Sequence, residues 1–305
     1  MDPDDVLIVD RKRSTSGFAS DTASVQRLVE HIGSVHNLQL ARLWNARRCL
    51  LVEGRDMKLL SVVHRTVCPE SESLESIPHI EIGGWGGWSY AIGSTLLLRN
   101  SGGEEITVYC ILDRDYHSDD AVSKRYEDAA RSGVNLHVWT RKEIENYFVC
   151  PAAIVRAISR RMPARTSSPT LDEINVQLEI VCNALKDETF DAMAAEILAD
   201  NRALGGGGAN KAARQIINDR WSSLEGKLAV VSGKRLLAEL SQWTQAQFGP
   251  AISASVVARE MTASEIDSEL ADLLRAIDAR GKLRTASDAA SNSIRAATKG
   301  IDAKA

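Results

Sequence analysis

Two apolar runs that end abruptly in acidic residues constrain this chain more than any other feature of its sequence. The first is Leu50-Leu51-Val52, followed by Glu53-Gly54-Arg55-Asp56, and the second is 108–112, followed by Asp113-Arg114-Asp115. A buried parallel strand has such a continuous aliphatic run, and the residues just past its carboxyl end line the functional edge of an open α/β sheet. We therefore expect four carboxylates to meet at one edge of one sheet: Glu53, Asp56, Asp113 and Asp115.

Four carboxylates gathered at one edge repel one another unless a positive charge lies between them. Hard divalent cations such as Mg²⁺ and Mn²⁺ prefer oxygen ligands of this kind. The pattern therefore predicts a Mg²⁺ or Mn²⁺ site. The alternative interpretation of the aspartates is turn formation and helix capping, for which Asp is also favoured.

Strand-like and helix-like segments alternate around these two motifs. Strands are expected over 49–53, 77–82, 106–112 and 134–139, and helices over 57–66, 90–98 and 118–132. Such β-α-β alternation is typical of a parallel sheet with crossover helices. The predicted fold is thus α/β, with a four-stranded parallel sheet flanked by helices.

The rest of the chain has a different character on each side of this unit. Residues 1–47 are expected to be a linker with helices, and 48–150 the α/β domain. Helical periodicity dominates 151–280, with breaks expected at 163–169, 205–208, Gly233 and 249–250, which predicts an additional all-helical domain. Residues 281–305 are poor in large apolar side chains and are expected to form a disordered tail.

Composition excludes several classes of protein. The chain has 305 residues, 44% of them hydrophobic and 26% charged, and a net charge of −4, which argues against coating nucleic acid by bulk charge. No apolar stretch reaches transmembrane length and no signal-peptide pattern opens the chain, so a cytoplasmic location without membrane contact is expected. The five cysteines lack CxxC spacing and the six histidines lack HxH spacing, which disfavours a disulfide framework or a zinc site.

The motifs also resemble a known family. A Glu ending one strand and an Asp-x-Asp ending a later one resemble a Toprim domain. The stretches GSVHNLQLARLWNARRCLLVEGRDMKLL, YCILDRDYHSDD and WTRKEIENYFVCP resemble the nuclease half of the OLD (overcoming lysogenisation defect) family and related ATPase-linked Toprim proteins. This resemblance spans residues 22–155 and extends more weakly to VVSGKRLLAEL at 230–240. It makes 48–150 the expected Toprim-like catalytic domain.

The resemblance implies hydrolysis of DNA phosphodiester bonds at a site with two Mg²⁺ or Mn²⁺ ions. It gives Glu53 the role of metal ligand or general base, and it implies further metal ligands at Asp56, Asp113, Asp115 and Glu145. It also implies that Lys234 neutralises charge on the phosphate, and that substrate contacts come from Gly54, Gly84 and Arg114. A first-turn helix glutamate and a solvated lysine remain the alternatives for Glu145 and Lys234.

Several alternatives remain open. The family carries an ATPase domain before Toprim, but this chain has no GxxxxGK[ST], since Gly205–Gly208 precedes Ala209-Asn210-Lys211. The chain is expected to be a fragment or a stand-alone version, with DNA, an ATPase domain or subunit, and a second copy of itself as partners. A topoisomerase or primase is a related enzymatic alternative. The alternative of another class is a non-catalytic Toprim module that binds nucleic acid or a partner ATPase.

Overall fold

A four-stranded, all-parallel sheet lies at the centre of the molecule. The computed structural model describes residues 7–10, 15–18, 42–43, 45–99, 106–162, 167–281 and 283. The strands are β3 (Arg48–Glu53), β4 (His79–Ile82), β5 (Thr107–Leu112) and β6 (Asn135–Val138), in the order β4-β3-β5-β6. The prediction of an α/β fold with a four-stranded parallel sheet flanked by helices is confirmed.

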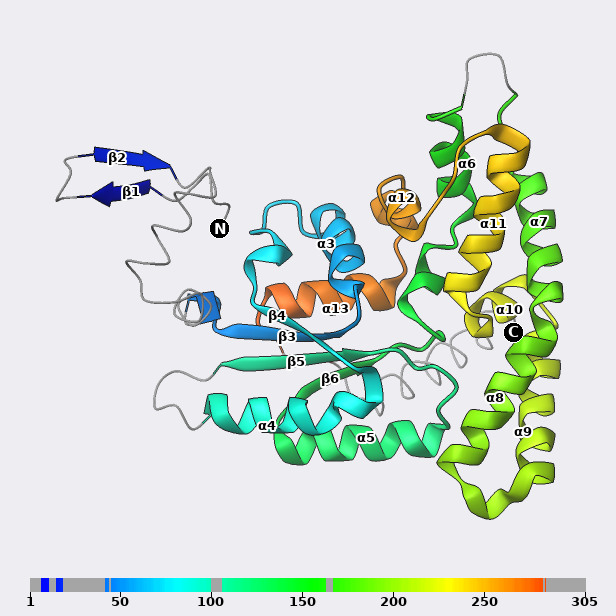
Figure 1. The fold of residues 1–305 in the computed structure, drawn as a ribbon, viewed down its shortest axis with the longest axis horizontal. Coiled ribbons are helices and arrows are strands. Elements are labelled where there is room, and N and C mark those ends of the chain that lie inside the picture. The colour runs from blue at the N-terminus through cyan, green and yellow to red at the C-terminus, as the bar shows by residue number, and fades with distance from the viewer. Residues whose placement is uncertain are drawn as a thin grey trace, which may run out of the picture.

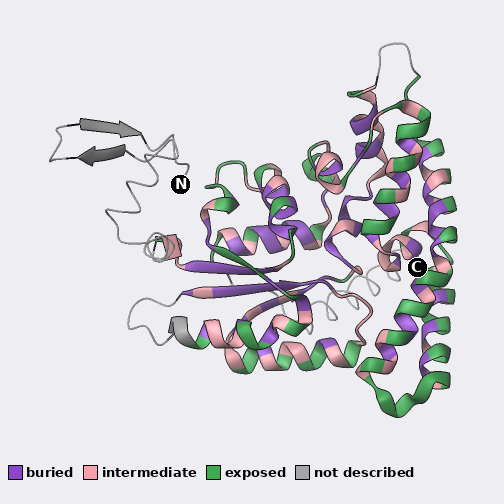
Figure 2. Ribbon diagram, in the orientation of Figure 1, coloured by how far each residue is buried: buried purple, intermediate pink, exposed green. Residues whose placement is uncertain are grey.

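Each face of the sheet is buried by its own set of helices (Figure 1). Alternate side chains of β3 and β5 point to opposite faces, as the pleat requires. Leu50 and Ile111 join the core formed with α3 (Asp56–Val67) and α13 (Ser268–Asp278). Leu51 and Cys110 join the core formed with α4 (Trp88–Arg99) and α5 (Asp119–Ser132). Burial on both sides explains why both strands read as unbroken aliphatic runs, and Figure 2 shows them buried along their length.

The strand order places a reversal between β3 and β5. From β3 the chain passes through α3 to β4 on one side, and then through α4 to β5 on the other side of β3. In open α/β sheets, the crevice outside the carboxyl ends of the strands at such a reversal is the usual ligand site. Glu53 ends β3 and Asp113 directly follows β5, so these two carboxylates lie on either side of that crevice.

Helices make up the described chain after β6. A short 3₁₀ helix, η4 (Ile144–Phe148), leads into α6 (Pro151–Ser159), α7 (Leu171–Ala184) and α8 (Lys186–Asp200). These are followed by η5 (Arg202–Leu204), α9 (Gly205–Arg220), α10 (Leu224–Val230), α11 (Gly233–Phe248) and α12 (Ala254–Ala258). The short η6 (Ala263–Glu265) then precedes α13, which returns to the sheet and packs with α12 against α3. The carboxyl ends of the strands therefore face the helical region (Figure 1).

Two sequence expectations need correction. The glycines at 205–208 were expected to interrupt a helix, but they form the first turn of α9, and the interruption lies just before them at Asn201–Leu204. Only Gly205 has a positive φ, of 64°, and it accommodates the change of direction between η5 and α9. The second strand is also shorter than expected, because residues 77 and 78 precede β4.

The chain ends are described only in part. Near the N-terminus, β1 (Leu7–Asp10) pairs antiparallel with β2 (Thr15–Phe18). The helices expected within 1–47 lie outside the described residues, except that 42–43 and 45–46 are helical, and the tail expected over 281–305 lies outside them except for 281 and 283. In the described part of the chain, no helix is both long and apolar enough to cross a membrane.

Candidate metal centre

The carboxylates of β3 and β5 meet at the strand reversal. The backbone N–H of Asp113 donates to Oε2 of Glu53 at 3.2 Å, which links the two strand ends directly. Gly84, in η3 (Gly84–Gly87) after β4, lies against the same carboxylate, since a Cβ there would be 2.5 Å from Oε1 of Glu53. Its φ of +55° is also one that L side chains rarely adopt. Gly84 therefore leaves room for the Glu53 carboxylate.

Two more carboxylates lie beside this pair. Asp56, in the first turn of α3, is 5% exposed, and its Oδ2 atom has no hydrogen-bond partner. Glu145, in η4, likewise has a buried Oε2 atom without a hydrogen bond. Asp113 is 2% exposed, and its Oδ1 atom accepts a hydrogen bond from the backbone N–H of Ile144 at 3.0 Å. The first turns of two elements thus bring their carboxylates to the crevice between β3 and β5.

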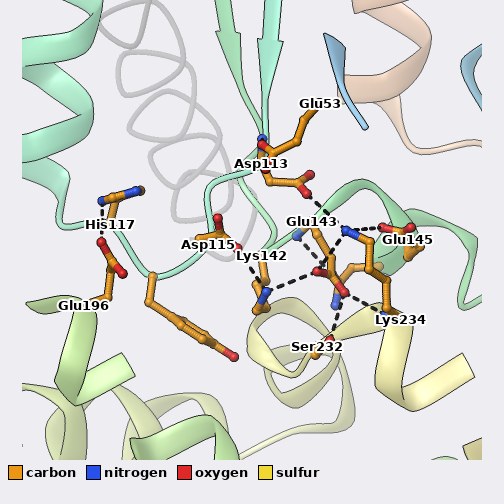
Figure 3. A network of polar contacts seen from close by, with 12 residues as sticks. Glu53, Asp113, Asp115, His117, Lys142, Glu143, Glu145, Glu196, Ser232 and Lys234 are labelled. Atoms are coloured by element: carbon orange, nitrogen blue, oxygen red, sulfur yellow. Dashed lines mark hydrogen bonds and ion pairs between the residues drawn. The ribbon is translucent and has the colours of Figure 1, made fainter. Parts of the chain in front are cut away.

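Lys234 is the positive charge of this group. Its Nζ atom lies 3.5 Å from Asp113 Oδ2, 3.5 Å from Glu143 Oε2 and 3.6 Å from Glu145 Oε2 (Figure 3). The side chain is 53% exposed, so the ammonium faces solvent as well as the carboxylates. The sequence-predicted residues Glu53, Asp56, Asp113, Glu145 and Lys234 are therefore brought together.

Burial and mutual repulsion raise the pKa values of the acidic groups in this crevice. Burial first, and then the charges of Asp113 and Glu145, raise the pKa of Asp56 to about 8. Burial also raises the pKa of Asp113 to about 7, although Lys234 opposes the shift. The pKa values of Glu53 and Glu145 are raised as well, again mainly by burial. The nearby positive charge is therefore too small to offset the free-energy cost of ionising these buried carboxylates.

Burial alone would lower the pKa of Lys234, but the surrounding carboxylates, Glu143 foremost, outweigh it and raise the pKa. Lys234 is therefore charged at neutral pH. Lys142 Nζ, 3.1 Å from Glu143 Oε2, is a second positive charge, but Glu53, Asp56, Asp113, Glu143 and Glu145 still outnumber the two ammonium groups.

The chemistry of these donors fits a hard divalent cation. Carboxylate oxygens are the ligands that Mg²⁺ and Mn²⁺ prefer, and Asp56 Oδ2, which makes no hydrogen bond, can accept such an ion. Glu145 Oε2 also makes no hydrogen bond, but it lies 3.6 Å from the Lys234 ammonium. The arrangement is nevertheless looser than a closed metal site. In the described chain, the sets of three ligand atoms mutually within 4.8 Å occur elsewhere, at His64–Cys68–Asp278 and His117–Glu196–Asp200.

Asp115 and Arg114, both predicted from sequence, make other contacts. Asp115 has a φ of 47°, and its Oδ1 atom is 3.0 Å from Nζ of Lys142. Its own N–H donates to the Lys142 carbonyl at 2.8 Å, so the Asp115 carboxylate is held toward Lys142 (Figure 3). Arg114 forms an ion pair with Asp119 at the start of α5. Gly54, with a φ of 51°, forms the turn from β3 into α3 and has open space around it.

Glu143 is the residue that the sequence interpretation missed. It is 3% exposed, and its Oε1 atom accepts hydrogen bonds from Ser232 Oγ at 3.0 Å and from the N–H of Lys234 at 2.6 Å. Burial opposes ionisation, but Lys142 and Lys234 outweigh it and lower the pKa of Glu143. Its position as the first carboxylate after β6, two residues before Glu145, was the available signal.

The start of α11 packs closely on the backbone of η4, and this contact positions Lys234. Asn146 is fully buried, and its Nδ2 atom donates to the carbonyls of Leu228 at 2.7 Å and Val231 at 2.8 Å. A Cβ on Gly233 would be only 2.7 Å from the N atom of Asn146, so a glycine is required where α11 begins. Ser232 caps α11 by accepting from the N–H of Arg235 at 3.3 Å. The start of α11 is thereby fixed against η4.

A scan of the sequence against protein-family models finds no match, and a search of curated proteins finds none either.

Proposed function

We propose that this chain is a metal-dependent nuclease that hydrolyses DNA phosphodiester bonds, with a Toprim-like active site similar to that of OLD-family nucleases. The observation that carries the proposal is the gathering of buried carboxylates at a strand reversal, where Asp56, whose Oδ2 atom makes no hydrogen bond, lies beside Asp113 and Glu145. A buried carboxylate without a partner is costly, and a cation with oxygen ligands removes that cost.

The proposed roles follow from position and charge. Glu53, Asp56, Asp113 and Glu145 would hold Mg²⁺ or Mn²⁺. Bound cations of this kind activate a water molecule and stabilise the leaving oxygen of an in-line displacement. Lys234 is half exposed and remains charged, so its ammonium can meet the negative charge that develops on the phosphate. Glu53 has a raised pKa, which favours its acting as a general base near neutral pH.

Glu143 has a positioning role in this proposal. Its carboxylate accepts from the Lys234 N–H and also lies 3.5 Å from the Lys234 ammonium, so it orients that side chain. Asp115 and Lys142 form a second ion pair beside it. The proposed partners are DNA and an ATPase domain or subunit, and the proposed compartment is the cytoplasm.

Cleavage of supercoiled plasmid in Mn²⁺ or Mg²⁺ tests the proposal. We expect the wild type to nick or cut the plasmid, and chelation of the metal to abolish the reaction. Asp113→Asn should lower the cleavage rate by at least about 100-fold, because it removes a charge that both metal and Lys234 need. Asp120→Asn is the matched control, since Asp120 is exposed in the first turn of α5, and it should cleave like wild type.

An intact plasmid with wild-type protein would overturn the nuclease proposal, as would unchanged cleavage by Asp113→Asn. If cleavage is absent, calorimetric titration with Mn²⁺ distinguishes a non-catalytic metal-binding module from a protein without a metal centre. Mn²⁺ binding without cleavage would favour the non-catalytic module, whereas absence of both would remove the metal centre itself.

A further inference from the structure

A second group of potential metal ligands lies at the opposite end of the sheet from the carboxylates. His64 and Cys68 are at the C-terminal end of α3, and Asp278 is the last residue of α13. This end of α13 is held where the strands begin, because Arg48, the first residue of β3, donates to the carbonyls of Ile277 and Asp278, both at 2.6 Å. The group is therefore separate from the candidate metal centre.

The three side chains converge. A ring nitrogen of His64, Sγ of Cys68 and a carboxylate oxygen of Asp278 all lie within 4.8 Å of one another. The spacing of His64 and Cys68 places them on one side of α3, and the N–H of Cys68 donates to the His64 carbonyl at 2.7 Å, which continues the helical geometry to that point. One ion can reach a nitrogen, a sulfur and an oxygen here.

The buried ring of His64 supplies an independent indication of a ligand. The side chain is 2% exposed, and its Nε2 atom makes no hydrogen bond. Asp278 Oδ1 lies 3.4 Å from Nε2 and is its ion-pair partner whenever the ring is protonated, while Asp278 Oδ2 accepts from Ser71 Oγ at 2.6 Å. A ring nitrogen buried this deeply that makes only this long contact costs free energy, and a directly bound cation would remove that cost.

The pKa of His64 suits a metal ligand, whereas the pKa of Cys68 opposes formation of the thiolate in the metal-free protein. Burial lowers the pKa of His64, which keeps the imidazole neutral, the form in which histidine binds metals. Burial and the charge of Asp278 raise the pKa of Cys68, so the thiol stays protonated until a cation displaces the proton. Arg48 and Arg275 are nearby positive charges. Arg48 donates to the two carbonyl oxygens at the end of α13, and Arg275 forms an ion pair with Asp272.

We propose that Nε2 of His64, Sγ of Cys68 and a carboxylate oxygen of Asp278 bind a Zn²⁺ ion that ties α3 to α13. Thiolate and imidazole ligands favour Zn²⁺ over Mg²⁺ and Mn²⁺. Three protein ligands leave one tetrahedral position for water, and the Ser71 hydrogen bond orients the carboxylate from outside. Binding of Zn²⁺ releases the thiol proton to solvent. The proposal is independent of nuclease activity.

Cobalt substitution tests the sulfur ligand. Co²⁺ is added to full-length, metal-free protein in excess Mg²⁺, which occupies oxygen-only sites, and the thiolate-to-cobalt absorption is recorded. We expect one equivalent of Co²⁺ to give this absorption and Zn²⁺ to displace it. Cys68→Ser should abolish it, whereas Cys150→Ser should retain it, because Cys150 is a half-buried cysteine outside the group. Absence of the absorption in wild type, or its persistence in Cys68→Ser, would overturn the proposal.

A measurement on the unsubstituted protein covers the case in which Cys68→Ser fails to fold. Mass spectrometry follows alkylation of each cysteine with and without Zn²⁺. Zn²⁺, but not Mg²⁺, should slow alkylation of Cys68 by at least about 10-fold while leaving Cys150 unchanged. The conservative variant Asp278→Asn should lose most of this protection. Equal alkylation of Cys68 in Zn²⁺ and Mg²⁺ would show that the three side chains form only a metal-free polar cluster.

Discussion

At the scale of single residues, Asp56 has the most costly environment in the candidate metal centre. It is 5% exposed, its Oδ2 atom has no partner, and Asp113 and Glu145 add negative charge nearby. The Asp56 carboxylate does not stabilise the folded state, since burying an uncharged side chain of the same shape would cost less free energy. We infer that its position reflects binding of a cation rather than stability.

The pH dependence of stability follows from the direction of that shift. The pKa of Asp56 is raised by folding from 3.8 to about 8, so between these values the folded state holds a proton that the unfolded state has lost. The contribution of Asp56 to the free energy of unfolding is then fully present below pH 3.8 and is lost as pH rises through about 8. Asp56→Asn removes this decrease, and the metal-free variant should be more stable than wild type by about 2–4 kcal/mol at pH 8.

Urea unfolding of metal-free protein between about pH 4 and pH 8 measures the effect of Asp56→Asn. The advantage of the variant should grow with pH and be reversed by Mn²⁺, which only wild type binds well. Asp191→Asn, an exposed change on α8, should follow wild type at every pH. A variant no more stable than wild type at the upper pH would contradict the repulsion inferred for Asp56.

At the scale of elements, the contact between η4 and the start of α11 determines where Lys234 lies. Gly233 packs directly on the backbone of Asn146, and Glu143 at the start of η4 accepts the Lys234 N–H. Both helices therefore share one hydrogen-bonded junction. A displacement of α11 by a few tenths of an ångström moves the ammonium relative to Asp113 and Glu145.

Gly233→Ala should separate the two helices. The new Cβ would be 2.7 Å from the Asn146 N atom and 2.9 Å from its Oδ1 atom, so α11 must shift. We expect a loss of about 1–3 kcal/mol in urea unfolding, together with slower plasmid cleavage. Gly93→Ala in α4 is the control, because a Cβ there meets nothing within 4 Å, and it should be neutral or stabilising by up to about 1 kcal/mol.

Equal stability of the two alanine variants would contradict the close contact at Gly233. Reduced cleavage by Gly233→Ala with an unchanged unfolding midpoint would show that the position of Lys234, rather than the stability of the junction, governs activity.

At the scale of the whole molecule, one core joins the sheet to the helical region. The cluster that contains Leu50 and Ile111 of the strands continues through Leu178 of α7 and Leu240 of α11 to Leu274 of α13. Polar contacts also cross this boundary: the Thr140 N–H donates to Glu269 Oε1 at 3.0 Å, and the Tyr147 hydroxyl donates to the same carboxylate. Unfolding of the helices would expose one face of the sheet.

We therefore expect the sheet and helical region to unfold in a single transition. Far-UV circular dichroism reports mainly the helices, whereas tryptophan fluorescence includes the fully buried Trp139 next to β6. The two signals should change at the same urea concentration. Two separated transitions would indicate that residues 48–150 and 151–280 are energetically independent domains.

Local sequence was sufficient for the sheet and for part of the site. Strand and helix periodicity act over a few residues, so the four strands and their crossover helices could be placed to within about two residues. Glu53 and Asp113 could be paired in advance because parallel strands end at the same edge of a sheet. Asp56 could be added because it lies three residues beyond the end of a strand, whereas Glu145 was implied only by the family resemblance.

Contacts between distant segments decided the rest. Asp115 has a positive φ, and its carboxylate contacts Lys142. Glu143 accepts the Lys234 N–H only because α11 begins against η4. His64 and Cys68 acquire a third neighbour, Asp278, from a helix 210 residues further along the chain, as 278 − 68 shows. Short-range periodicity cannot encode such a meeting, because packing of the whole core determines which helix ends come together.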